Sequence, residues 1–214
     1  PVGSPLYSGH ISASRSQNDS AIRIYSWSYG LPGMMVFGDS TQQASAIEAR
    51  IRLNWGGFWN VGVAMGVNRT VLQDASAPFN GPGCYYLALN ASIGSLTLFN
   101  GTANTPAGYW YEGGWEGIAN VSLPNHDWNA THKIRLVAKD GGLLQGYLND
   151  QLMLTYQIPT GQTPIGRFAL VASNAQYDFY DVNAQSSSGG VLWSTGSTAS
   201  SITVAPSETT TYSV

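Results

Sequence analysis

The stretch GRFALVASNAQYDFYDV, residues 166–182, contains the pattern that decides the fold. In its first half the side chains alternate with a period of two, which is the period of a β-strand. The alternation puts Phe168, Leu170 and Ala172 on one face and Arg167, Ala169 and Val171 on the other. A Ser-Asn pair follows and predicts a tight turn, after which QYDFYDV alternates again. We therefore predict two adjacent strands joined as a hairpin.

Three further segments with the same period lie upstream. GYLNDQLMLTYQ, residues 146–157, predicts a hairpin with an Asn-Asp turn. HDWNATHKIRLVAKDG, residues 126–141, predicts a strand that ends in an Asp-Gly turn. SAIEARIRLN, residues 45–54, is the clearest strand, because apolar residues at odd positions alternate with polar residues. Glu48, on the polar side, is expected to form a cross-strand ion pair.

The whole chain contains about a dozen such segments, at the roughly 8–12-residue spacing that is typical of an all-β sandwich. We expect each sheet to bury one face and to show the other to solvent. In residues 60–66 the outward positions hold only small residues besides Asn60. Small residues leave room for something flat to approach the backbone, most commonly a covering loop.

The order of these strands resembles the closing strands of the concanavalin A-like jelly rolls, a group that includes laminin-G-like and many carbohydrate-binding domains. The resemblance implies an all-β, two-sheet antiparallel jelly-roll sandwich over residues 1–184, with the first strands beside the last one. It also implies a glycan as partner, because most such domains bind sugars and a minority cleave them.

The character of the chain changes after residue 184. Residues 185–190, QSSSGG, have the composition of a flexible linker. Residues 191–214 then resemble the opening strands of bacterial surface immunoglobulin-like repeats, through WSTG, SITV and TTTYSV. Such a repeat needs about 100 residues, so this short β tail is a clipped domain, packs on the sandwich, or lends strands to a neighbouring copy of the chain.

Composition excludes several classes of partner. The net charge is −3 and no Lys/Arg cluster appears, which argues against nucleic acid. No apolar run approaches the length of about 18 residues that spans a membrane. Cys84 is alone, so a disulfide framework is not possible and a small buried apolar role is expected. Charged residues are only 10% of the chain, and the hydroxyl-rich remainder is typical of extracellular or cell-surface β-proteins.

Catalytic signals are weak. The Glu-X-Asp-X-X-Glu strand of concanavalin-like glucanases is missing from the sequence. Glu112 and Glu116 lie four residues apart in a Gly-rich loop, where two carboxyls of a glycosidase would converge, but solvated loop acids are the commoner case. His126 and His132 are read as turn and strand residues and not as zinc ligands, because no third strong ligand is nearby. We therefore expect a chain that is not an enzyme.

Binding signals are stronger, because aromatic residues crowd two Gly-rich connections, WGGFW and YWYEGGWEG. Trp and Tyr rings stack on sugar rings while neighbouring polar groups take the hydroxyls. The alternatives are that these rings cover the ends of the core or form a protein contact. The candidate ligand-binding residues are Trp55, Phe58, Trp59, Asn60, Tyr109, Trp110, Tyr111, Glu112, Trp115 and Glu116.

A structural calcium ion is implied by the resemblance, since jelly rolls of this kind often hold one at the sandwich edge. Asp178 and Asp181 lie in the matching last strand, and carboxylate oxygens suit calcium. The alternative is that Asp181 caps the end of the strand.

These signals lead to a secreted, noncatalytic glycan-binding or adhesion module of a multidomain bacterial surface protein. The first alternative is a structural subunit of an extracellular fibre that exchanges residues 191–214 between copies. The second alternative is a glycoside hydrolase.

Overall fold

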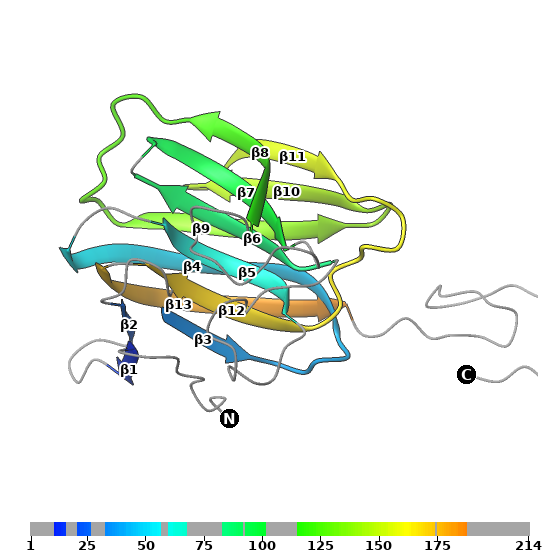
Figure 1. Cartoon of the computed structure of the whole chain (residues 1–214), viewed down its shortest axis with the longest axis horizontal. Coiled ribbons are helices and arrows are strands. Elements are labelled where there is room, and N and C mark those ends of the chain that lie inside the picture. The colour runs from blue at the N-terminus through cyan, green and yellow to red at the C-terminus, as the bar shows by residue number, and fades with distance from the viewer. Residues whose placement is uncertain are drawn as a thin grey trace, which may run out of the picture.

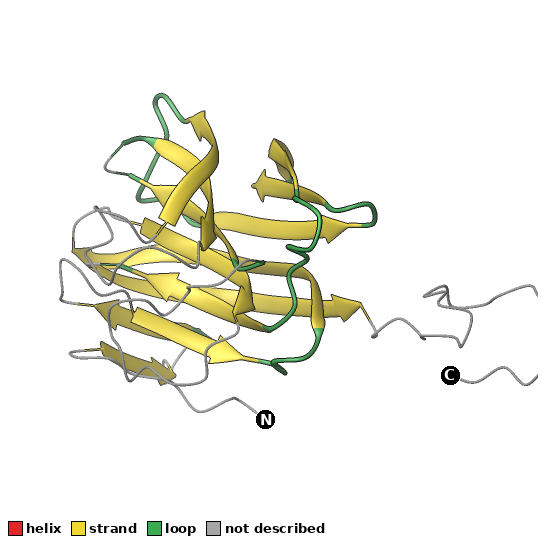
Figure 2. Ribbon diagram, turned by 45° about the vertical axis from the view of Figure 1, so that its right-hand side comes forward, coloured by secondary structure: helices red, strands yellow, loops and turns green. Residues whose placement is uncertain are grey.

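The computed structural model describes residues 11–15, 21–26, 33–56, 60–67, 83–91, 93–101, 115–173 and 175–187. At positions 11–15, 26, 55–56 and 115–116 the description covers the backbone alone. All the regular elements in these ranges are strands (Figure 2). They are β1 (Ile11–Arg15), β2 (Ile22–Ser26), β3 (Gly33–Phe37), β4 (Gln43–Gly56), β5 (Asn60–Val67), β6 (Tyr85–Asn90), β7 (Ser95–Gly101), β8 (Trp115–Ser122), β9 (His132–Lys139), β10 (Leu143–Leu148), β11 (Gln151–Gln157), β12 (Arg167–Ala172) and β13 (Ala175–Ser187).

The strands form two antiparallel sheets that lie in two layers (Figure 1). Sheet A has seven strands in the order β1-β2-β13-β4-β9-β10-β11. Sheet B has six, in the order β3-β12-β5-β6-β7-β8. The predicted all-β sandwich is therefore confirmed. The expected pairing of an early strand with the last one is also confirmed, because β2 pairs with β13.

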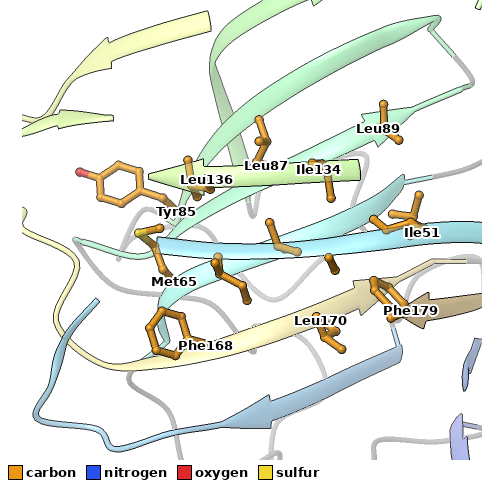
Figure 3. Packing of buried hydrophobic residues seen from close by; sticks show 14 of the residues in the cluster. Ile51, Met65, Tyr85, Leu87, Leu89, Ile134, Leu136, Phe168, Leu170 and Phe179 are labelled. Atoms are coloured by element: carbon orange, nitrogen blue, oxygen red, sulfur yellow. The ribbon is translucent and has the colours of Figure 1, made fainter. Parts of the chain in front are cut away.

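The main core fills the space between the sheets. Ile47, Ala49 and Ile51 of β4 are buried, while Arg50 and Arg52, which alternate with them, are exposed, as the period of two predicts. In Figure 3 the labelled side chains of the two sheets converge from both layers, with Ile51, Ile134, Leu136 and Phe179 from sheet A and Met65, Tyr85, Leu87, Leu89, Phe168 and Leu170 from sheet B. Burial of this set is the main source of stability.

The predicted hairpin at Ser173-Asn174 is wrong in one respect. The two strands exist, but β12 lies in sheet B between β3 and β5, and β13 lies in sheet A between β2 and β4. The turn therefore passes from one sheet to the other. Alternation shows which side chains share a face, but it does not specify the strand that pairs with each edge.

Sheet B also departs from the predicted one-sided burial. A second cluster of buried apolar residues lies apart from the main core, and Ala64, the central outward residue of β5, is fully buried. Its members are Met34, Val36, Ala64, Val67, Cys84, Tyr86, Ala88, Ala169 and Val171. Cys84 is buried and free, as predicted. The space expected beside Gly62 is filled by β6, since a Cβ there would lie 1.9 Å from the carbonyl oxygen of Leu87.

The predicted β10–β11 hairpin is confirmed, and it matters for the site below. Asn149 and Asp150 have φ angles of 50° and 66°, the left-handed pair that a type I′ turn needs. The Oδ1 atom of Asn149 accepts a hydrogen bond from the backbone N–H of Lys133 at 2.9 Å. The turn is thereby held against the first residues of β9.

The last described strand runs beyond the expected boundary. β13 reaches Ser187, because residues 185–187 pair with residues 43–46 of β4. Half of the predicted linker 185–190 is therefore strand, and residues 191–214 lie outside the described residues. Among the described residues, no helix has the length and apolar character needed to cross a membrane.

Candidate functional site

The predicted aromatic site lies largely outside the described residues. This holds for Phe58, Trp59, Tyr109, Trp110, Tyr111 and Glu112. The other positions differ from the prediction of turns: Trp55 lies in β4, paired with Gln176, and Trp115 and Glu116 begin β8. Strand pairing extends into both Gly-rich segments because their backbone groups find partners across the sheet.

Cross-strand register places Asn60, next to the first aromatic segment in the sequence, and Trp115, in the second, at opposite ends of sheet B. Asn60 starts β5 and pairs with Asn90. The pairing of β5 with β6 runs from Asn60 and Asn90 to Met65 and Tyr85. Trp115 pairs with Gly101, whose backbone N–H donates to the carbonyl of Cys84 at 2.9 Å, just past the Tyr85 end of that pairing. β7, which has seven residues, spans roughly 23 Å between these two ends. Asn60, which follows the first aromatic segment, and Trp115, which lies in the second, are therefore at the two ends of the sheet.

Asn60 is the one predicted binding residue with a described side chain at these anchors. It is half-buried, and its Oδ1 atom is buried without a hydrogen-bond partner. Its backbone carbonyl accepts from the N–H of Ser173 at 3.0 Å. An unused amide acceptor at this corner is suited to a ligand hydroxyl or to a water molecule.

Asp178 is buried on the other side of sheet A from the main core. Arg23 donates to its two carboxylate oxygens at 2.7 and 3.0 Å, Asn54 donates to Oδ2, and Arg52 lies 3.6 Å from Oδ2. Burial alone would raise the pKa of this carboxyl. The hydrogen bonds and charges of Arg23, Asn54 and Arg52 outweigh it, so the pKa of Asp178 lies below its ordinary value.

Asp181 is exposed, and its Oδ2 lies 3.3 Å from Nη1 of Arg50. It has a left-handed φ of 49° at a bulge in β13, where the pairing with β4 shifts register. Arginines thus supply the positive charge beside both predicted calcium ligands. No cluster of three or more His, Cys, Asp or Glu that would hold a metal forms within the described ranges. The calcium site stays a prediction, and these contacts do not favour it.

An open polar groove of about 440 Å³ lies where β4, β9 and the β10–β11 turn meet. Its lining combines carboxylates, an ammonium, a guanidinium, an amide and a hydroxyl. The lining residues are Glu48, Ala49, Arg50, Thr131, Lys133, Asn149, Asp150 and Asp181. We call this site the β4–β9 groove.

Lys133 is the central cation of the β4–β9 groove. Its Nζ lies 2.8 Å from Oδ1 of Asp150 and 3.7 Å from Oε2 of Glu48. The hydrogen bond that Lys133 donates to Asp150 raises the pKa of Lys133, partial burial opposes this, and the charge of Glu48 adds to the rise. The expected cross-strand ion pairing of Glu48 is confirmed, with Lys133 and Arg135 of β9 as its partners.

Lys133, Asn149 and Asp150 were not predicted as site residues. Their sequence signals are a strand start and an Asn-Asp turn, which are common structural features. What joins them to Glu48 is the register of β4 against β9 and of β9 against β10. That register depends on contacts far apart in the sequence.

The side of sheet A that faces away from the main core, and that carries the β4–β9 groove, holds most of the charged residues of the described chain. The Cζ atom of Arg52 lies 5.5 Å from the ring centroid of Tyr180, and that of Arg135 lies 5.4 Å from the ring centroid of Tyr147. Five of the nine Lys and Arg residues of the chain lie here: Arg23, Arg50, Arg52, Lys133 and Arg135. Polar recognition groups are therefore concentrated on this face.

Comparison with solved structures identifies the architecture. A carbohydrate-binding module of Bacillus subtilis is similar with a TM-score of 0.58 and 15% identity, over 82% of this chain and 92% of that one. A Bacillus subtilis protein of unknown function with a galectin-like fold gives 0.54 and 12%, over 81% and 86%. Porphyranase B of Zobellia galactanivorans gives 0.51 and 11%, over 84% and 79%. The fold is a jelly-roll sandwich.

At these identities the likeness extends to the fold, and function depends on sites that each family builds on it. No model of a known protein family matches the chain, and no curated protein matches it. The three structures give no support to the immunoglobulin-like resemblance of residues 191–214.

Proposed function

We propose that this chain is a noncatalytic glycan-binding module of the jelly-roll class. The observation that carries the proposal is the β4–β9 groove, where hydroxyl-binding groups from three strands and a turn converge around an open space. The likeness to a carbohydrate-binding module supports it at the level of the fold.

The lining chemistry matches a sugar. A pair of neighbouring hydroxyls both donates and accepts hydrogen bonds, so its site needs acceptors and donors side by side. Glu48, Asp150 and Asp181 supply acceptors, and Lys133 and Arg50 supply donors. The ion pairs among them hold these groups in place before a ligand arrives, which lowers the entropy cost of binding.

The aromatic residues are a second part of the proposal. Trp55, Phe58 and Trp59 come just before Asn60, whose amide oxygen is unused. Trp115 and Glu116, the last two candidate residues of the second aromatic segment, pair at the other end of sheet B. Because Asn60 and Trp115 lie at opposite ends of sheet B, the aromatic residues next to them in the sequence suit an extended polysaccharide better than a single sugar.

Binding fits the β4–β9 groove better than cleavage does. Both Glu48 and Asp150 contact Lys133, which puts their oxygens at most about 6.5 Å apart, near the separation of glycosidase carboxyls. A glycosidase needs one of the two carboxyls to carry a proton. Here the ammonium of Lys133 lies between the two carboxyl groups and contacts both, an arrangement that suits holding hydroxyl groups.

An extracellular setting, with a role in adhesion, is part of the same proposal. Its support is a chain with only 10% charged residues and abundant Ser, Thr and Asn. The fibre alternative differs in one observable: deletion of residues 191–214 would abolish self-association of the purified chain, which is measured by light scattering.

The test is a glycan array probed with the full chain, followed by titration of any hit. Asp150→Asn keeps a turn residue but removes the charge that faces Lys133, and we expect at least about tenfold weaker binding, or 1.4 kcal/mol. Asp140→Asn, in the neighbouring β9–β10 turn and outside the groove, is the matched control. Trp110→Ala tests the aromatic part in the same way.

Two results would overturn the proposal. One is that no glycan binds. The other is that Asp150→Asn and Trp110→Ala both leave the affinity unchanged. Release of reducing ends by the wild-type chain, stopped by Glu112→Gln, would favour the glycoside hydrolase alternative.

A further inference from the structure

Two histidines that are six residues apart in the sequence meet ring to ring in front of β9. The centroids of the His126 and His132 rings are 4.3 Å apart, with an angle of 30° between their planes. The connecting turn is folded back by Asp127, whose Oδ1 accepts from the N–H of Asn129 and whose carbonyl accepts from the N–H of Ala130. This contact lies outside the β4–β9 groove, and nothing in the proposed function uses it.

His132 presents a free lone pair. Its Nε2 lies 2.8 Å from the carbonyl oxygen of Asp127. A carbonyl only accepts, so the proton must be on Nε2 and the Nδ1 atom of the neutral ring carries a lone pair. That Nδ1 atom is buried without a hydrogen-bond partner, in a residue that is 6% exposed. Metal-binding histidines commonly have this arrangement, with one N–H donating to a backbone carbonyl and the other nitrogen free for the ion.

His126 supplies a second unused nitrogen. Its Nε2 is also buried without a partner, and its ring meets the indole of Trp128 edge to face at 4.6 Å. Burial and the neighbouring His132 lower the pKa of His126, and Asp127 opposes this only in part.

We propose that Nε2 of His126 and Nδ1 of His132 bind one divalent transition ion of borderline softness, such as Cu²⁺ or Zn²⁺, with water in the remaining positions. These histidines were not expected to bind zinc, because no third strong ligand is nearby among the described residues; in this proposal water takes the positions that further protein ligands would fill. Two buried nitrogens without partners, on rings in contact, call for a ligand that interacts with both. Imidazole pairs favour Cu²⁺ and Zn²⁺ over Mg²⁺ and Ca²⁺.

One ring must turn before both nitrogens can bind the same ion. The two rings are stacked, with centroids 4.3 Å apart and an angle of 30° between their planes, so their lone pairs do not yet converge on one point. His126 is only partly buried and its ring contacts are with Trp128 and His132, so its ring is the one expected to turn. His132 stays held by Asp127.

The test is a calorimetric titration of the full, chelator-treated chain with Cu²⁺ or Zn²⁺, with Mg²⁺ as the hard-ion control. We expect saturation at one ion per chain, and His126→Gln should weaken binding at least about tenfold. The matched control is His10→Gln, which changes the remaining histidine of the chain. Cu²⁺ should also quench tryptophan fluorescence, and Trp128→Phe should remove most of that quenching.

Because His132→Gln can disturb folding, the second arm uses nitrogen NMR of the imidazole rings in the wild-type chain. We expect the metal-free His132 to be protonated on Nε2, and the metal to shift the Nδ1 signal. The proposal is overturned by an absence of binding, by binding that survives His126→Gln, or by a water bridge between the two nitrogens that the metal does not displace. Its failure would leave glycan binding untouched, since the two sites share no residue.

Discussion

At the scale of single residues, Asp178 shows how this chain buries a charge. A carboxylate removed from water costs free energy unless cations and hydrogen bonds replace the water. Arg23, Arg52 and Asn54 do so from β2 and β4, the strands on both sides of β13. The charge therefore joins three neighbouring strands of sheet A.

We expect Asp178→Asn to lower the free energy of unfolding by about 1.5–3 kcal/mol, the range for hydrogen bonds to a charged group. Both arginines are partly exposed, so water can replace some of the lost contacts. The measurement is urea unfolding followed by circular dichroism. The control is Asp181→Asn, whose exposed pair with Arg50 should contribute less than about 1 kcal/mol. Equal losses in the two variants would contradict this account.

At the scale of the element, β5 is a central strand that depends on glycine. Gly62 faces the backbone of β6, where the carbonyl oxygen of Leu87 and the Cα of Ala88 leave no space for a methyl group. Backbone atoms in a paired strand cannot turn aside as a flexible side chain can. The absence of a side chain at Gly62 thus sets how closely β5 and β6 approach.

Gly62→Ala is expected to destabilise the chain by about 1–3 kcal/mol or more, because the added Cβ would lie 1.9 Å from the carbonyl oxygen of Leu87. Gly117→Ala in β8 is the matched control. Its Cβ would meet only side-chain atoms at 3.5–4.0 Å, and the unfolding midpoint should be unchanged or slightly raised. The same urea experiment distinguishes the two, and a tolerated Gly62→Ala would show that β5 and β6 can separate at no cost.

At the scale of the whole molecule, acid should destabilise the fold in two steps. The pKa of His126 is lowered from 6.5 in the folded state, chiefly by burial, and that of Asp178 is lowered from 3.8. For both groups the unfolded chain binds its proton first as the pH falls, so stability falls with pH. The first loss begins near pH 6.5 and the second below about pH 3.8.

Urea midpoints measured from pH 8 to pH 3 check this prediction. We expect His126→Gln to flatten the curve near pH 6 and Asp178→Asn to flatten it at the acid end. A wild-type curve that is level between pH 7 and pH 5 would contradict the role given to His126.

The amino-acid sequence by itself determined where the strands are and which side chains share a face. Two features depend only on residues that are close in the sequence, and could be predicted without knowing which strands pair. They are the period of two in β4 and β12 and the Asn149-Asp150 turn. Only the tertiary structure decided that β12 and β13 lie in different sheets, that the outer face of β3, β12, β5 and β6 is buried, and that Asn60 and Trp115 lie at opposite ends of sheet B. It also brought Lys133 to Glu48 and His126 to His132. Pairing between distant segments selects these contacts, and the local pattern leaves the choice of partner open.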